Sequence, residues 1–373
     1  MRKILTSESV NIGHPDKTCD VIADAFLDAA LAQDANSQMA VECAIKDNYL
    51  FIYGEATTKA KIKYEEIASE ILKEIGYQDG FTFITKISQQ SPEINKAVVK
   101  TDDLAANDQG IVYGYACSDT PDLMPMPIMM AHKLMGRYEK FRWEEMQIPN
   151  AKQKWFPDAK CQVSIEYDDD TPVAIHTILV SVSHCPSLSN SEIEEAIKKN
   201  VIDITLSDSS FEKVCAKEAK IIINPSGAFT MWGAHSDSGC VGRKIIVDTY
   251  GGVGRHGGGA FSSKNATKVD RSGAYYCRYV AKNLVHNGLC TKCEVSASYA
   301  IGVSDPIKIN IETFGTGCEK KASKFVKIHF DFRPSNIIKE LDLLKPIYKK
   351  TACYGHFGRS EFSWEKTNKY PKI

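Results

Sequence analysis

The residues best suited to chemistry lie between Asp248 and Asp270, where six glycines fall within Gly251–Gly259. Glycine lets main-chain N–H groups approach a ligand closely, because it has no side chain to keep the ligand away. The cations around these glycines are Arg255, His256, Lys264 and Lys268. Donor-rich loops with nearby cations suit a polyphosphate. Asp270 adds a carboxylate that could hold the Mg²⁺ accompanying the phosphates.

Two other readings of this stretch are open from the residues alone. It could be an ordinary surface loop, because glycine-rich segments commonly are. Gly252-x-Gly254-x-x-Gly257 follows the apolar run Ile245–Val247 and matches the dinucleotide-binding pattern. That pattern should open a helix within a βαβ unit, which the following residues do not favour. A Walker phosphate loop is excluded because no Gly-Lys-Ser/Thr ends the stretch.

A second candidate lies at Gly13–Lys17, where His14 and Asp16 flank Pro15. Proline suits the first position of a helix, and apolar residues at helical spacing follow, so we expect a helix to begin here. Asp16 could simply stabilise the positive end of that helix. Its closeness to His14 and Lys17 makes a functional site an equal alternative.

Three hairpin–helix units are predicted to carry these loops. Alternating apolar residues predict hairpins over residues 39–57, 161–183 and 293–314, each followed by a helical pattern. Their near-equal spacing predicts three similar α+β domains, over residues 1–100, 111–220 and 221–373. The polar stretch 100–110 suits a surface lid. Pro157–Lys160 is expected to be a polar turn before the second hairpin.

Composition narrows the class of protein. The 373 residues are 43% hydrophobic and 25% charged, which is ordinary for a globular protein, and the net charge is −1. This charge predicts no general affinity for nucleic acid or an anionic membrane. We expect no signal peptide and no membrane span, because no apolar run is long enough. The twelve cysteines suggest a reducing cytosol, and we interpret the Cys290-x-x-Cys293 spacing as incidental.

Several motifs together resemble the S-adenosylmethionine synthetase (methionine adenosyltransferase) family. They run in order along nearly the whole chain, from Leu5–Ser9 to Tyr354–Arg359. The most specific are Gly13-His14-Pro15-Asp16-Lys17, Gly227 with Phe229, Gly242-Arg243-Lys244 through Gly252, and Gly257–Ser262.

The resemblance implies three α+β domains with pseudo-threefold symmetry. It also implies a homodimer or a dimer of dimers with active sites at the interface, in the cytoplasm. The implied substrates are ATP and L-methionine, with two Mg²⁺ ions per site and K⁺ as cofactors. The methionine sulfur would attack ribose C5′, the triphosphate would leave, and the same site would hydrolyse it to phosphate and pyrophosphate. A neutral sulfur needs no general base, so the chemical demand falls on charge developing at the leaving O5′.

The resemblance also implies roles for individual residues. The implied catalytic residues are His14, Lys160, Lys264 and Lys268. The implied ATP contacts are His14, Asp158, Lys160, Phe229 (stacked on adenine), Asp237, Arg243, Lys244, Ala260 and Lys264. Methionine would be held by Glu55, Gln90, Asp237 and Lys268. Metals would be bound by Asp16, Asp270 and Glu8 for Mg²⁺ and by Glu42 for K⁺. Residues 100–110 would form a gating loop.

Some positions depart from the family pattern near the expected nucleotide. Trp232-Gly233-Ala234 stands where Gly-Gly-Pro is usual, Ala228 and Phe156 replace arginines, and Ser263 replaces a glycine. These departures leave a regulatory paralogue with weak activity as one alternative. A nicotinamide-dependent oxidoreductase is the other. Formation of a sulfonium product from ATP and methionine would separate all three.

Overall fold

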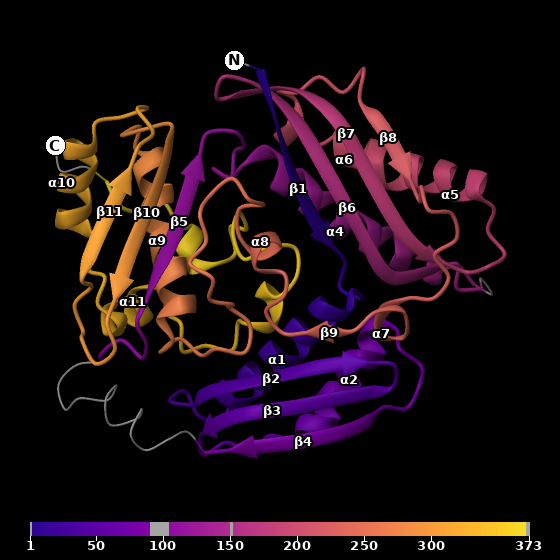
Figure 1. Cartoon of the computed structure of the whole chain (residues 1–373), viewed down its shortest axis with the longest axis horizontal. Helices are drawn as coiled ribbons and strands as arrows, with labels where there is room; N and C mark the ends of the chain where they lie inside the picture. Colours follow the sequence, from indigo (N-terminus) through magenta and orange to yellow (C-terminus); the bar gives the residue numbers. More distant parts are fainter. Residues whose placement is uncertain (1, 90–103, 150–151, 371–373) are drawn as a thin grey trace.

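The computed structural model of the chain describes residues 2–89, 104–149 and 152–370 (Figure 1). Its strands are β1 (Arg2–Val10), β2 (Gln38–Lys46), β3 (Tyr49–Thr57), β4 (Thr82–Ser88), β5 (Gly110–Cys117), β6 (Trp155–Asp168), β7 (Thr171–His184), β8 (Lys220–Ile223), β9 (Gly239–Cys240), β10 (Lys292–Tyr299) and β11 (Lys308–Glu312). Its α-helices are α1 (Pro15–Leu31), α2 (Tyr64–Ile75), α4 (Met126–Met146), α5 (Asn190–Ile197), α6 (Asp203–Leu206), α7 (Gly233–Ser236), α8 (Ile245–Asp248), α9 (Val269–His286), α10 (Glu319–His329) and α11 (Pro334–Glu340). Gln90 and residues 100–103 of the expected gating loop lie outside the described residues.

The described strands form three separate sheets, with orders β4-β3-β2-β9, β1-β6-β7-β8 and β11-β10-β5. The hairpins β2–β3, β6–β7 and β10–β11 confirm the three predicted from alternation, and α2, α5 and α10 follow them. The mixed α+β class with three domains is therefore confirmed. The proposed domain limits at residues 100, 111, 220 and 221 stay a prediction.

Segments distant in sequence complete each sheet. Strand β1 pairs along its length with β6, so the first residues of the chain belong to the sheet of the second hairpin. Strand β5 pairs with β10, and the short β9 pairs with β2. The loops that join the sheets therefore converge near the centre of the molecule, as Figure 1 shows around α1, α8 and β9.

Helices cover the sheets and create two hydrophobic cores. Helix α4 packs on β1 and β6, and α9 packs on β5 and β10; their buried residues form one continuous core. A second core lies between α1, α2 and the β2–β3 hairpin, and Tyr348 from the C-terminal region completes it. No helix within the described part of the chain is long and apolar enough to cross a membrane.

One segment differs from the expected turn. Pro157–Lys160 continues strand β6, and a register shift against β7 occurs between Trp155 and Ala159. The proline and aspartate suggested a turn, but an irregular strand tolerates proline where no ladder hydrogen bond is needed. The result is that Asp158 and Lys160 are held on a strand of the sheet.

Candidate active site

His14 is held by the start of helix α1. It is the N-cap residue, with extended backbone, and its Nδ1 accepts a hydrogen bond of 3.2 Å from the Asp16 N–H. Because Nδ1 is an acceptor, the neutral ring carries its proton on Nε2. Burial, reinforced by the nearby charge of Lys244, lowers the pKa of His14 to about 4. The ring is therefore neutral near pH 7, with one N–H to donate.

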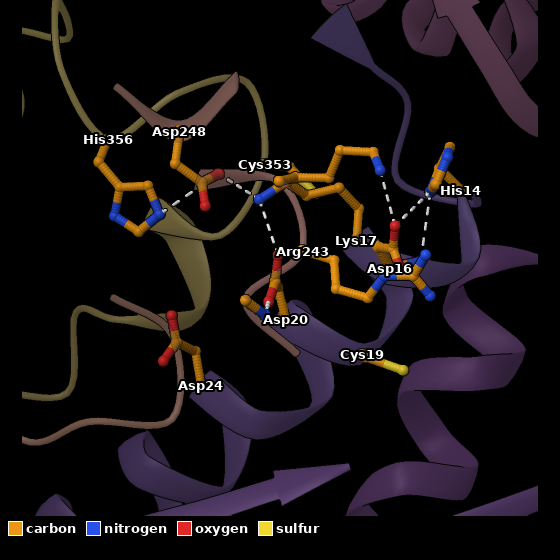
Figure 2. A network of polar contacts seen from close by, with 12 residues as sticks. His14, Asp16, Lys17, Cys19, Asp20, Asp24, Arg243, Asp248, Cys353 and His356 are labelled. Atoms are coloured by element: carbon orange, nitrogen blue, oxygen red, sulfur yellow. Dashed lines mark hydrogen bonds and ion pairs between the residues drawn. The ribbon is translucent and has the colours of Figure 1, made fainter. Parts of the chain in front are cut away.

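Asp16 lies beside His14 and gathers cations. It is 2% exposed, and its Oδ2 is 2.7 Å from Lys244 Nζ. Its Oδ1 accepts the Cys240 N–H at 3.0 Å and is 3.7 Å from Arg243 Nε. Figure 2 shows His14, Asp16 and Arg243 converging at the start of α1. A buried carboxylate that faces two cations is a suitable centre for a Mg²⁺–phosphate complex, in which the cations contact phosphate.

A cavity of about 280 Å³ opens beside this group. The site residues that line it are His14, Asp158, Lys160, Phe229 and Asp237. The main chain of Phe229 is fixed by two hydrogen bonds to His184, of 3.2 and 2.9 Å. The structure therefore brings residues from three distant sequence segments to one cavity.

The two acidic side chains and the lysine that line this cavity lie in different environments. Asp158 Oδ2 accepts the Gly233 N–H at 2.9 Å, and burial raises the pKa of Asp158 to about 7. Asp237 is exposed, and its Oδ1 accepts the N–H of Ser238. Lys160 Nζ pairs with Glu8 Oε2 at 2.8 Å, with both side chains partly exposed. Lys160 and Glu8 can therefore separate readily toward a phosphate and a metal, because an exposed ion pair is weak.

A second cluster forms at the end of the glycine-rich loop. Lys264 Nζ is 2.6 Å from Asp270 Oδ2. Glu55 pairs with Ala40 in the β2–β3 ladder, and Ala40 also bridges to Lys264, so the three residues are neighbours. Lys268 is the N-cap of α9; burial lowers its pKa and the charge of Glu55 opposes that shift. This cluster resembles the first in pairing carboxylates with lysines.

The two clusters are separate within one chain. Among the residues that the structure describes, no hydrogen bond or ion pair joins the group around Asp16 to the group around Asp270. Asp24 of α1 contacts the loop of the second cluster, and it lies eight residues beyond Asp16. Eight residues of α-helix span about 12 Å. The two clusters therefore lie apart along helix α1.

Two further expected residues have their own contacts. Glu42 lies on β2, and its Oε2 is 3.5 Å from the hydroxyl of Tyr53. Ala260 packs against Gly242, where an added Cβ would be 2.6 Å from the Ala260 Cβ. Ala260 is thus beside the residue that precedes Arg243. Gln90 lies outside the described residues.

The glycines and cations of the loop serve partly to pack it. A Cβ at Gly257 would lie 1.8 Å from the Ile111 carbonyl oxygen, and one at Gly259 would lie 2.3 Å from the Asp270 carboxyl carbon. Arg255 is engaged with Glu294 and Glu312 at 3.0 and 3.1 Å. Arg255 therefore stabilises the loop against strands β10 and β11. It does not join the ring of cations that the sequence predicted around a polyphosphate.

Two of the departures from the family pattern, Phe156 and Trp232, pack against each other. The rings of Phe156 and Trp232 stack with centroids 5.9 Å apart, and Trp232 also contacts Tyr77 at 4.6 Å. The rings of Phe156 and Trp232 therefore pack together beside Tyr77. Ser263 has a φ of 78°, the left-handed conformation that favours glycine.

Sequence reasoning did not find three buried residues that attach the loops of the two clusters to α1, namely Asp20, Asp24 and Arg271. Both aspartates are fully buried in α1, and Arg271 directly follows Asp270 in α9. The i, i+4 spacing of aspartates along α1 was the available signal. The spacing alone does not identify these residues, because buried acids need partners that only the folded chain reveals.

Comparison with known proteins shows the family to which the chain belongs. The chain matches the N-terminal domain of S-adenosylmethionine synthetase over residues 2–98, the central domain over 103–229 and the C-terminal domain over 231–366. It is 45% identical to the S-adenosylmethionine synthase of Sorangium cellulosum (strain So ce56), over 99% of this chain and 88% of that protein.

The fold and these matches define a three-domain α+β enzyme. More particularly, the chain belongs to the S-adenosylmethionine synthetase family across nearly its whole length. Membership supports S-adenosylmethionine synthesis by an enzyme that transfers an adenosyl group to methionine. None of these matches favours the regulatory paralogue or the oxidoreductase.

Proposed function

We propose that the chain joins ATP and L-methionine in a single displacement followed by triphosphate hydrolysis. The methionine sulfur forms a bond to ribose C5′ as the C5′–O5′ bond breaks, and the bonding electrons leave with O5′ of the triphosphate. Water then cleaves the triphosphate to pyrophosphate and phosphate. The cavity shared by His14, Phe229 and Asp237, next to Asp16 and Lys244, is the observation that carries this proposal.

The residues of this cavity suit distinct tasks. The His14 Nε2–H donates a hydrogen bond to O5′ as negative charge develops there, and it needs no proton exchange to do so. Phe229 stacks on adenine, and the exposed Asp237 accepts the methionine ammonium. Lys160, Arg243 and Lys244 contact the phosphates. Each role is supported by the side chain's position around one cavity or at the adjacent Asp16.

The donor set fits Mg²⁺ when substrate is bound. The described residues contain no group of three or more acidic, His or Cys side chains that could hold a metal alone. Mg²⁺ usually takes only one or two protein carboxylates and completes its shell with water and substrate phosphates. Asp16, Asp270 and the weaker candidate Glu8 supply such carboxylates. The ion would neutralise charge on the leaving triphosphate.

We propose K⁺ at Glu42, whose carboxylate is partly exposed and contacts Tyr53. An oxygen donor suits this hard cation. The twelve free thiols support a reducing compartment, and we propose the cytoplasm.

We propose that the active site is completed by a second copy of the chain. The group at Asp16 and the group at Asp270, Lys264, Lys268 and Glu55 would face each other across a homodimer, or a dimer of dimers. Outward-facing apolar residues on the sheet that carries Glu55 support this assembly: Tyr49, Phe51 and Tyr53 of β3 and Ile84 of β4 are exposed. Such a patch commonly marks an interface.

The proposed reaction is tested by incubating the protein with ATP, methionine, Mg²⁺ and K⁺ and measuring the sulfonium product by mass spectrometry. Asp16→Asn and Asp270→Asn should each lower turnover by about 10²-fold or more, because a carboxylate facing the metal–phosphate complex is lost. Asp47→Asn is the matched control, because Asp47 lies in the exposed β2–β3 turn. Wild-type turnover in both site variants would reject the metal assignment, and no sulfonium product from the wild type would reject the reaction.

A further inference from the structure

Helix α1 carries aspartates at positions 16, 20, 24 and 28, one every four residues. This spacing places them in one row along the helix. Each accepts main-chain N–H groups from the C-terminal half of the chain. The donors are Cys240 to Asp16, Gly242 to Asp20, Ser263 to Asp24, and Tyr348 and Lys349 to Asp28, at 2.8–3.0 Å.

The middle of this row is stabilised by two buried cations. Lys17 lies between Asp20, at 2.8 Å, and Asp248 (Figure 2). Arg271 forms a two-pronged pair with Asp24, with both N–O distances 2.7 Å. A carboxylate buried without such partners would be strongly unfavourable, so each cation fixes the conformation of its aspartate. Asp20, Asp24 and Arg271 are each 0% exposed.

Asp20 controls the segment that carries Arg243 and Lys244. It accepts the N–H of Gly242, which directly precedes Arg243, at 2.9 Å. Lys17 reaches Asp248, at the end of α8, from the same turn of α1. Both ends of residues 242–248 are therefore attached to one place on the helix.

Asp24 controls the segment that carries Lys264, Lys268 and Asp270. It accepts the N–H of Ser263, which directly precedes Lys264, at 3.0 Å. Its partner Arg271 also donates to the Lys264 carbonyl oxygen at 3.1 Å. The loop is thus attached to α1 on both sides of its functional residues.

We infer that Asp20 and Asp24 are positioning residues, which set the basic side chains of the two phosphate-binding segments relative to Asp16. They do this through the hydrogen bonds to Gly242 and Ser263. The inference rests on the proposed function of Arg243, Lys244 and Lys264.

Asp28 provides an internal comparison. It belongs to the same row and accepts two N–H groups, from Tyr348 and Lys349, at 2.8 and 2.9 Å. The segment it holds contains none of the proposed site residues. A purely structural role for the row would make the loss of Asp28 comparable to the loss of Asp20, whereas a positioning role separates the two.

The test compares Asp20→Ala and Asp20→Asn with Asp28→Ala and Asp28→Asn. Binding of inorganic tripolyphosphate with Mg²⁺ is measured by calorimetry, and its hydrolysis by phosphate release, below the unfolding temperature of each variant. Asp20→Ala should reduce binding and turnover by roughly 10²-fold, since a displacement near 1 Å can have that effect. Asp20→Asn retains an oxygen acceptor for Gly242 and should recover much of the loss. The Asp28 variants should remain within about twofold, although they unfold at lower temperature.

Asp24→Asn tests the second segment, which carries Lys264, in the same way. It should reduce tripolyphosphate binding and hydrolysis more than Asp28→Asn does. Equal losses at positions 20 and 28, or an Asp20→Asn variant no better than Asp20→Ala, would overturn the inference. A wild-type protein that hydrolyses tripolyphosphate but forms no sulfonium product would overturn the proposed function and leave the positioning of the phosphate residues intact.

Discussion

The proton of His14 determines what this side chain can contribute. Its Nδ1 is occupied by the Asp16 N–H, and its pKa of about 4 keeps the ring neutral above pH 5. His14→Ala removes the Nε2 donor and should lower the kcat of sulfonium formation by about 10²–10³-fold, the usual effect of removing one donor to a developing oxyanion. Steady-state kinetics with saturating ATP and methionine measure this loss.

The pH dependence gives an independent check on His14. Because its pKa is lowered, the ring does not become protonated as pH falls from 8 to 5.5, so His14 should contribute no acid limb to kcat in this range. The exposed His176 on β7 serves as a control, and His176→Ala should leave kcat unchanged. An acid limb near pH 6.5 that disappears in His14→Ala would contradict the assigned tautomer and charge.

Burial of Asp158 predicts a pH-dependent stability. Its folded pKa of about 7 lies above the unfolded value of about 3.9, so between these values the folded state binds more protons than the unfolded state. Its contribution is therefore greatest at low pH, and stability falls as pH rises through 7. Asp158→Asn keeps an oxygen for the Gly233 N–H and lacks the ionisation.

The free energy of unfolding in urea should accordingly shift in favour of Asp158→Asn as pH rises from 5 to 8. Because one pKa unit corresponds to about 1.4 kcal/mol, this change in the free energy of unfolding is a few kcal/mol at most. For Asp47→Asn, in the exposed turn, the difference from wild type should stay nearly constant over the same range. A constant difference for Asp158→Asn as well would show that Asp158 is ionised in the folded state throughout.

Single residues were predictable where their chemistry is local. Pro15 and Asp16 indicated the start of α1 correctly, because helix ends are set by adjacent residues. Pro157 and Asp158 suggested a turn and lie instead in β6, because the pairing of Trp155 with His184 of β7 extends that strand past them. Arg255 looked available to phosphate, and its acidic partners Glu294 and Glu312 come from strands that sequence spacing does not place beside it.

At the scale of elements, alternation and helical spacing predicted all three hairpins and the helices after them. These patterns report burial on one face, which is a local property of the sequence. The partners of β1 and β5 were not predictable in this way. Strand β1 pairs with β6, and β5 pairs with β10, although these partners are distant in sequence. Such long-range pairing depends on the packing of the whole chain.

The loop before α9 contains a residue in an unfavourable conformation. Ser263 is buried with φ 78°, and a left-handed backbone costs a residue with a Cβ about 1–2 kcal/mol. Ser263→Gly removes this strain but gains unfolded-state entropy worth about 0.5–1 kcal/mol. The net result should be a stabilisation of about 0.5 kcal/mol, measured as the free energy of unfolding in urea.

Ser263→Ala separates the backbone effect from the loss of the hydroxyl. The alanine variant retains a Cβ and hence the strain, so it should be no more stable than wild type. Should alanine stabilise the protein as much as glycine, the hydroxyl and not the backbone conformation would be responsible.

At the scale of the whole molecule, the separation of the two clusters predicts complementation between chains. His14→Ala disables the first cluster and Lys268→Ala the second, so each homodimer should be nearly inactive. Exchange of subunits should restore about a quarter of the wild-type activity, because a mixed dimer then has one intact site of two in about half of the dimers. Activity is measured before and after mixing, with exchange followed by mass spectrometry.

The matched control mixes Lys268→Ala with Asp270→Ala, which both affect the second cluster. This pair should recover nothing, because every site in the mixed dimer lacks one residue of that cluster. No recovery in the first mixture despite complete exchange would place the whole site within one chain. Recovery in the control would show that Lys268 and Asp270 do not act in one cluster.

The row of aspartates on α1 also determines when the N-terminal part of the chain can finish folding during synthesis. Fifteen of the helix's seventeen residues are buried, yet the N–H donors for Asp16, Asp24 and Asp28 lie 224, 239 and 320 residues further along the chain. At about 5–20 residues per second, a ribosome needs roughly ten seconds or more to deliver the first of them. During that interval the carboxylates of α1 must remain in water, so the N-terminal hairpin cannot complete its core before the C-terminal third emerges.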